Sequence, residues 1–91
     1  MKIHELKTDP EVFEAVYSRY KNFEIRKSDR DFQIGDALTL RETKSTGEQM
    51  KRDPLNHPLV YIGRVAYRVI TYILRGPIYG LQDEWVIMSI E

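Results

Sequence analysis

Three charged residues in one short segment, Lys21, Glu24 and Arg26, form the pattern with the clearest potential for ligand chemistry. Alternation of polar and apolar residues predicts a β-strand here, with Glu24 and Arg26 on one face and Phe23 and Ile25 on the other. Arginine can form two parallel hydrogen bonds to a phosphate or a base edge, and a carboxylate can accept a hydrogen bond from an exocyclic amine. Lysine can contact phosphate, or act as a base if burial lowers its pKa.

The same residues also have a purely structural interpretation. Glu24 and Arg26 could form a partly buried salt bridge that holds a helix to a sheet. Lys21 could be a solvated lysine at the start of the strand, with only its aliphatic part packed against the protein. Both interpretations remain open at the level of the sequence.

Six segments are expected to position these residues. They are a strand at 2–7, a helix from 8–10 to about 19, and strands at 21–27, 37–41, 59–74 and 85–90. The helix start is indicated by Thr8 followed by Glu11, or by Asp9 before Pro10, which are two alternative capping registers. Residues 43–58 are polar and predict a loop or hairpin tip.

Several strands with one early helix predict a single α+β, mainly β domain over residues 1–91. The expected architecture is a small β-barrel with the N-terminal helix packed beside it, because closure hides strand edges that would otherwise be exposed. Gly63, inside the longest strand, suggests a bulge or a bend.

A basic stripe is expected on the longest strand, where Arg64 and Arg68 have the same parity. Tyr61, Tyr67 and Tyr72 are interleaved with them and could stack on bases while the arginines hold the backbone. We nevertheless expect most of these tyrosines to pack in the barrel wall, because a domain of this size needs their apolar area.

Two further aromatic residues lie near the C-terminal strand. Tyr79, in a loop bracketed by Gly76 and Gly80, could belong to a lid over a cleft, although Gly80 could serve only to allow a positive φ angle. Trp85 could stack on a base at the mouth of the cleft or fill one end of the barrel.

Composition excludes several classes of function. Fourteen basic residues balance 14 acidic ones, so the chain is not expected to hold long duplex DNA mainly by charge. The charge is unevenly distributed, because residues 43–75 carry six basic and two acidic residues. The absence of cysteine excludes disulfides, a thiolate nucleophile and a cysteine–zinc site. With only His4 and His57, far apart in sequence, no metal site and no cofactor are expected.

No segment indicates export or membrane insertion. The N-terminus lacks the apolar core of a signal peptide, and no apolar run approaches the roughly 20 residues that span a bilayer. A cytoplasmic location without a membrane partner is therefore expected.

Several motifs together resemble the ASCH superfamily, whose domains share the PUA-like β-barrel. They are Lys21-x-Phe23-Glu24-Ile25-Arg26, Phe32-Gln33-Ile34-Gly35-Asp36, Val69-Ile70-Thr71-Tyr72-Ile73-Leu74 and Tyr79-Gly80-Leu81. The resemblance covers nearly the whole chain and is closest to a subfamily of small bacterial and phage proteins. It implies binding of RNA, or of a nucleotide-like small molecule, in a cleft between helix and barrel.

One enzyme branch of that superfamily hydrolyses the acetyl group of acetylcytidine with a lysine, a threonine and a glutamate. The lysine aligns with Lys21, but Glu24 stands where the branch has its threonine, so the resemblance favours a binding module over an enzyme. Lys21 and Glu24 would be the catalytic pair of the alternative, a small amidohydrolase. A module that docks on a protein partner through an aromatic surface is a further alternative.

The sequence therefore predicts an RNA- or nucleotide-binding module. The residues expected to bind the ligand are Lys21, Glu24, Arg26, Arg64, Arg68 and Tyr79.

Overall fold

One sheet of five strands dominates the structure, a computed structural model that describes residues 1–91. The elements in chain order are β1 (Ile3–Thr8), α1 (Pro10–Tyr17), β2 (Phe23–Lys27), β3 (Ala37–Thr43), α2 (Gly47–Arg52), β4 (Tyr61–Arg75) and β5 (Trp85–Ile90). The domain is mainly β, as predicted, with two helices. All five strands overlap the segments expected from the sequence.

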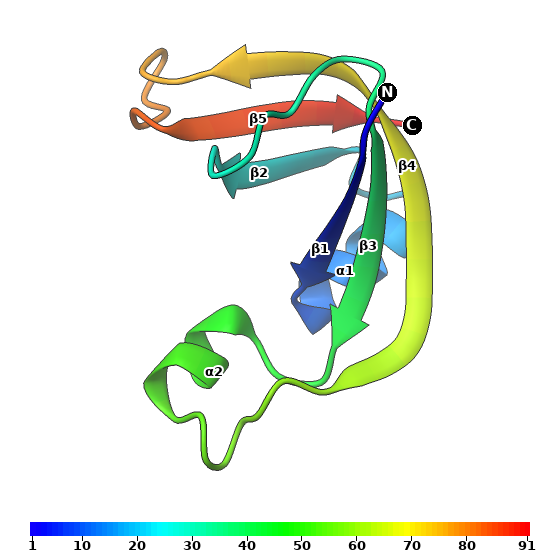
Figure 1. Cartoon of the computed structure of the whole chain (residues 1–91), viewed down its shortest axis with the longest axis vertical. Helices are drawn as coiled ribbons and strands as arrows, with labels where there is room; N and C mark the ends of the chain where they lie inside the picture. The colour runs from blue at the N-terminus through cyan, green and yellow to red at the C-terminus, as the bar shows by residue number, and fades with distance from the viewer.

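The strand order in the sheet is β1-β3-β4-β5-β2. The β1–β3 pair is parallel and the other three pairs are antiparallel. The long strand β4 pairs with β3 along its first part and with β5 along its last part. It curves strongly between the two parts, so that the β1–β3 half and the β5–β2 half of the sheet run across each other (Figure 1).

Gly63 marks an irregularity in β4, as predicted. The register against β3 shifts between Arg41 and Thr43, whose partners are Val65 and Tyr61, so β4 carries extra residues there. Gly63 has a φ angle of 100°, which glycine adopts more readily than any other residue.

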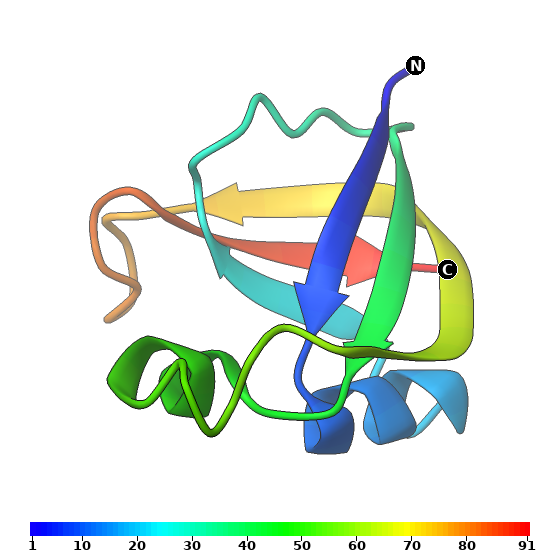
Figure 2. The same cartoon turned by 60° about the horizontal axis from the view of Figure 1, so that its bottom comes forward.

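The sheet is open, whereas the sequence predicted a closed barrel. β1 and β2 are its two edges and form no backbone ladder with each other. A side chain spans the gap instead, because Arg26 Nη2 on β2 donates to the Lys7 carbonyl oxygen at 2.8 Å and lies 3.3 Å from Thr8 Oγ1. Helix α1 lies across the end of the sheet below β1 and β3 (Figure 2). The prediction of a single helix is therefore corrected, because the chain also forms α2. The predicted closed barrel is instead an open sheet, and the Arg26 side chain spans the gap between its edges β1 and β2.

The core forms between the inner face of the folded sheet, α1 and the loop before β3. Its buried apolar residues are Leu6, Phe13, Val16, Phe32, Leu38, Leu40, Ala66, Ile70, Val86, Met88 and Ile90. Tyr67 and Tyr72 are 72% and 58% exposed, and Tyr61 is half-buried. The expectation that most of these tyrosines pack in the wall is wrong, because aliphatic residues, phenylalanine and methionine fill the inner face.

A buried polar pair lies next to this core. His4 Nε2 and Asp36 Oδ2 are 2.8 Å apart, and both side chains are less than a tenth exposed. Asp36 also accepts hydrogen bonds from the backbone N–H groups of Lys2 and Gln33. The Lys2 backbone bond and then the His4 contact lower the pKa of Asp36 to about 2.

The segment predicted as a polar loop contains helix α2. Thr46 and Gln49 form a capping box, in which each side chain bonds the backbone N–H of the other. None of its residues is buried, and Figure 1 shows it projecting away from the sheet. The backbone N–H of Gly47 donates to Asp9 Oδ1 at 2.8 Å, which ties α2 to the start of α1.

Candidate ligand-binding site

Strand β2 turns its charged face inward and its apolar face outward. Its ladder with β5 places Glu24 opposite Met88 and Arg26 opposite Val86, both of which are buried in the core. Glu24 is only 2% exposed, whereas Phe23 and Ile25 are 43% and 48% exposed. Burial of apolar surface would favour the opposite orientation. The inward placement of two charges is therefore a local departure from ordinary patterning, of the kind found at functional sites.

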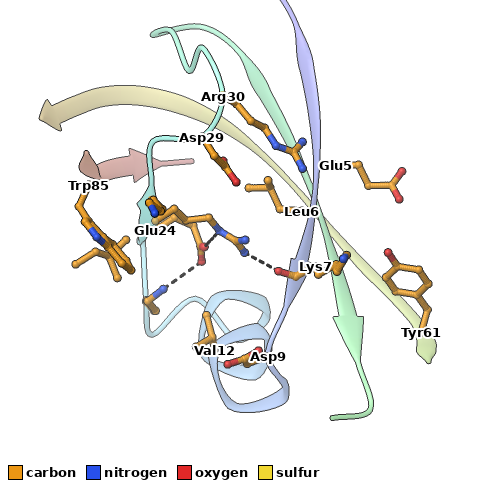
Figure 3. A pocket seen from close by; sticks show the side chains of 14 residues that line it. Glu5, Leu6, Lys7, Asp9, Val12, Glu24, Asp29, Arg30, Tyr61 and Trp85 are labelled. Carbon is orange, nitrogen blue, oxygen red and sulfur yellow. Dashed lines mark hydrogen bonds and ion pairs between the residues drawn. The ribbon is translucent and has the colours of Figure 1, made fainter. Parts of the chain in front are cut away.

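A cavity of about 710 Å³ lies along this inward face, between the edge strands β1 and β2 and the start of α1 (Figure 3). Charged side chains dominate its wall. The lining residues are Glu5, Leu6, Lys7, Asp9, Val12, Lys21, Glu24, Ile25, Arg26, Lys27, Asp29, Arg30, Tyr61 and Trp85. The cavity thus lies at the open edge of the sheet.

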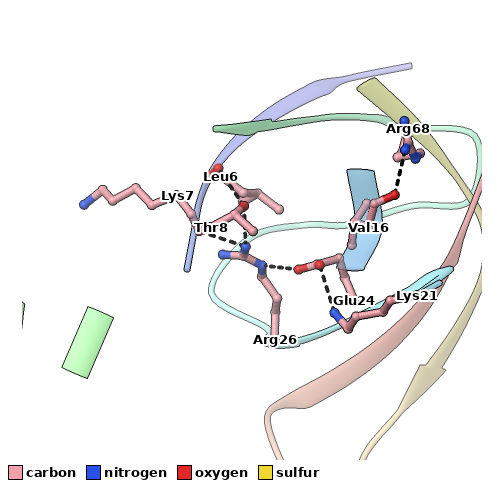
Figure 4. A network of polar contacts seen from close by, with 8 residues as sticks. All are labelled: Leu6, Lys7, Thr8, Val16, Lys21, Glu24, Arg26 and Arg68. Atoms are coloured by element: carbon pink, nitrogen blue, oxygen red, sulfur yellow. Dashed lines mark hydrogen bonds and ion pairs between the residues drawn. The ribbon is translucent and has the colours of Figure 1, made fainter. Parts of the chain in front are cut away.

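Lys21, Glu24 and Arg26 are brought together in this wall. Lys21 Nζ lies 3.1 Å from Glu24 Oε1, and Arg26 Nε donates to Glu24 Oε2 at 3.0 Å (Figure 4). The side chains of Lys21 and Arg26 are 17% and 23% exposed. Glu24 and Arg26 thus both border the cavity beside α1, but the Glu24 carboxylate is itself buried.

The chain positions Lys21 through the end of α1. Arg19, with a φ angle of 63°, reverses the chain after the helix. The backbone N–H of Lys21 then donates to the Ala15 carbonyl oxygen at 3.0 Å, so β2 begins directly against α1. The Lys21 ammonium also lies 4.8 Å from the centre of the Phe23 ring.

Glu24 is placed to hold the two cations rather than to touch a ligand itself. Both of its oxygens are bonded and almost none of its side chain is accessible. Hydrogen-bond donors remain on the cations, because Arg26 bonds through Nε and Nη2 and leaves Nη1 unpaired. Lys21 likewise uses one of its three donors. The cluster therefore keeps unpaired hydrogen-bond donors at the wall of the cavity, and a group bound there would have to offer acceptors.

Arg64 and Arg68 lie outside this cavity and are bonded within the protein. Arg64 pairs with Glu42 and with Glu14 of α1, at 2.8 Å in each case, and these two carboxylates raise its pKa. Arg68 donates to the Val16 carbonyl oxygen at 2.9 Å, near the C-terminus of α1. Burial, then the nearby Arg19, lowers the pKa of Arg68. These arginines anchor α1 to β4.

The aromatic residues are distributed around the cavity. Tyr79 is 91% exposed and is not part of its wall. Trp85 and Tyr61 lie on opposite sides in Figure 3, and the Arg41 guanidinium lies 3.5 Å from the centre of the Tyr61 ring. Trp85, which is half-buried, also borders a second hollow of about 300 Å³ with Ile25 and Leu81.

Three cavity residues, Lys7, Lys27 and Arg30, were not singled out from the sequence. They come from β1, the end of β2 and the following loop, and only the fold brings them to one cavity. No His, Asp and Glu side chains gather in threes or more where they could bind a metal ion. Neither helix has the length and apolar character needed to cross a membrane.

Comparison with known families matches residues 3–90 to a family described as a domain of unknown function, DUF3850. Because the match covers nearly the whole chain, the protein belongs to that family. No curated protein matches the chain. The resemblance to ASCH domains is not tested by this match and stays a prediction.

Proposed function

We propose that this DUF3850 domain is a binding module for a nucleotide-like ligand, free or within RNA, which enters the cavity between β1, β2 and α1. Lys21 and Arg26 donate hydrogen bonds to acceptor atoms of the ligand, and Glu24 holds both cations in place. The predicted PUA-like architecture would place a ligand in such a cleft between helix and sheet. A cytoplasmic location would give access to nucleotides and RNA.

The inward face of β2 supports this proposal most directly. Two charged residues of β2 lie opposite apolar core residues of the neighbouring strand β5, and they border a cavity instead of sealing it. A salt bridge with only a structural role gives little net stability, because desolvation of the charges offsets their attraction. A role in binding explains why Lys21 and Arg26, which are partly exposed, keep unpaired hydrogen-bond donors beside an open cavity.

Calorimetric titration with a panel of nucleosides, nucleotides and short RNAs tests the proposal. The Lys21→Gln variant should weaken binding about tenfold, since it removes a charged donor while Glu24 keeps its bond to Arg26. Lys51→Gln, at an exposed position on α2 away from the cavity, is the matched control and should bind as the wild type does. Equal affinities of the wild type and Lys21→Gln for every ligand would contradict the proposed site.

The contact between Lys21 and Glu24 favours one alternative, a small amidohydrolase acting on a modified nucleoside such as acetylcytidine. At 3.1 Å the two groups are within hydrogen-bond distance, as an acid–base pair requires. Incubation of the protein with acetylcytidine and related amides separates the two functions. Turnover that disappears in Glu24→Gln would establish the enzyme, and binding without turnover would establish the module.

A further inference from the structure

Three basic side chains border the cavity without a partner inside the molecule. Lys7, Lys27 and Arg30 are exposed, and each contributes to the cavity wall. None of the eight ion pairs of the protein involves them. Lys21 and Arg26, by contrast, already share Glu24. The cavity thus has two kinds of cation: a paired inner cluster and an unpaired set, here called the rim cations.

The acidic residues of the cavity offset only part of the charge on the rim cations. Glu5 is paired with Arg41 at 2.9 Å, and Asp9 accepts a hydrogen bond from the Gly47 backbone. Asp9 and Asp29 are the two carboxylates without a cationic partner, because Lys21 and Arg26 engage Glu24. The three rim cations therefore exceed them by one positive charge, which favours an anion at the rim.

We propose that the ligand is a single nucleoside monophosphate, whose phosphate binds the rim cations while its base lies against the donors of Lys21 and Arg26. This inference rests on the proposed function and specifies its ligand. A phosphate monoester carries roughly two negative charges at neutral pH and offers three acceptor oxygens, which match unpaired lysine and arginine donors. A nucleoside without phosphate would leave the rim cations unused.

A longer strand of RNA fits the charge distribution less well than one nucleotide does. Arg64 and Arg68 on the long strand are bonded to α1 and to Glu42, and Arg75 at its end donates to the Phe32 carbonyl oxygen. The chain as a whole carries no net charge. Because these arginines already have partners, a strand that extended along β4 should gain little affinity from added nucleotides.

Isothermal calorimetry with matched ligands tests the inference. The ligands are the four common nucleosides, their 5′-monophosphates, inorganic phosphate and a 5′-phosphorylated tetranucleotide. The wild type should bind at least one monophosphate about tenfold more tightly than its nucleoside, because several charge-assisted contacts are added. Inorganic phosphate should bind more weakly than that monophosphate. The tetranucleotide should bind no more than a few-fold more tightly than the monophosphate does.

Substitution of the rim cations should remove only the part of the binding affinity that the phosphate group contributes. In a variant carrying Lys7→Gln, Lys27→Gln and Arg30→Gln, nucleoside affinity should be unchanged and the preference for the monophosphate lost. Lys51→Gln should keep the preference. Equal affinity of the wild type for nucleoside and monophosphate would overturn this inference. A tetranucleotide that binds far more tightly than the monophosphate would overturn it too. In both cases the proposed function would still stand. Failure of every ligand to bind would overturn both.

Discussion

At the scale of single residues, Arg26 connects the fold to the site. Its guanidinium bonds Glu24 through Nε and the backbone of Lys7 through Nη2, so one side chain joins β2 to β1 across the open edge of the sheet. The Nη1 donors have no partner within the protein, and the side chain lines the cavity. Lysine would not replace it, because its single nitrogen lacks the planar fork by which the guanidinium bonds Glu24 through Nε and Lys7 through Nη2.

Substitution of Arg26 should therefore reduce both stability and binding. Arg26→Ala should lower the free energy of unfolding by roughly 2–3 kcal/mol, since a buried carboxylate loses one of two cationic partners. Arg52→Ala, which removes an exposed pair with Glu48 on α2, should cost less than about 0.5 kcal/mol. Urea unfolding of both variants measures the difference, and equal losses would show that Arg26 does not support the fold.

Asp36 gives a second prediction at this scale. Its pKa lies at about 2 in the folded protein, below the ordinary value near 3.8, so folding favours its ionised form. The resulting stabilisation is fully present above about pH 4 and is lost as pH falls towards 2. Unfolding measured between pH 5 and 2 should show a smaller loss of stability on acidification in Asp36→Asn than in the wild type. Parallel profiles would contradict this assignment.

At the scale of elements, β2 decides where the polar cavity lies. Its partner β5 has a buried face of Val86, Met88 and Ile90, and the register brings Glu24 and Arg26 onto that face. An apolar residue at position 24 would extend the core to the sheet edge and leave Lys21 without its carboxylate. The orientation of one edge strand thus turns the end of the core into a polar cavity.

The reversed burial of β2 predicts an unusual pattern of mutational sensitivity. Ile25→Thr should cost less than about 1 kcal/mol, because the side chain is already 48% exposed. Met88→Ala, on the neighbouring strand and fully buried, should cost about 2–5 kcal/mol. Thermal or urea unfolding of both variants tests this. Similar losses would indicate that the outer face of β2 is covered in solution.

Some elements could be predicted from sequence because their signals are local. Alternation of polar and apolar residues indicated β2, β-branched and aromatic residues indicated β4, and Pro10 indicated the start of α1. Helix α2 also had a local signal, Thr46 three residues before Gln49, which the polar composition of its surroundings obscured. The reversed faces of β2 had no such signal, since apolar residues are ordinarily assigned to the core.

At the scale of the whole molecule, tertiary structure decides which charges remain available. Arg64 and Arg68 look like a basic stripe in the sequence, but Glu14, Glu42 and the end of α1 engage them. The rim cations, by contrast, do not form a pattern in the sequence, because they come from three separate segments. Only the folded sheet brings them to one cavity. Local sequence patterns could not predict whether the sheet closes either, because closure depends on whether two edge strands distant in sequence pair with each other.

The location of binding tests the central claim most directly. In amide chemical-shift mapping of the labelled protein, addition of the tightest-binding nucleotide should perturb residues 5–9, 21–27 and 29–30, which surround the cavity. The β4 segment around Arg64 and Arg68 should change little. Perturbations concentrated on that segment, or none at saturating nucleotide, would contradict the proposal that the gap between β1 and β2 is the binding site.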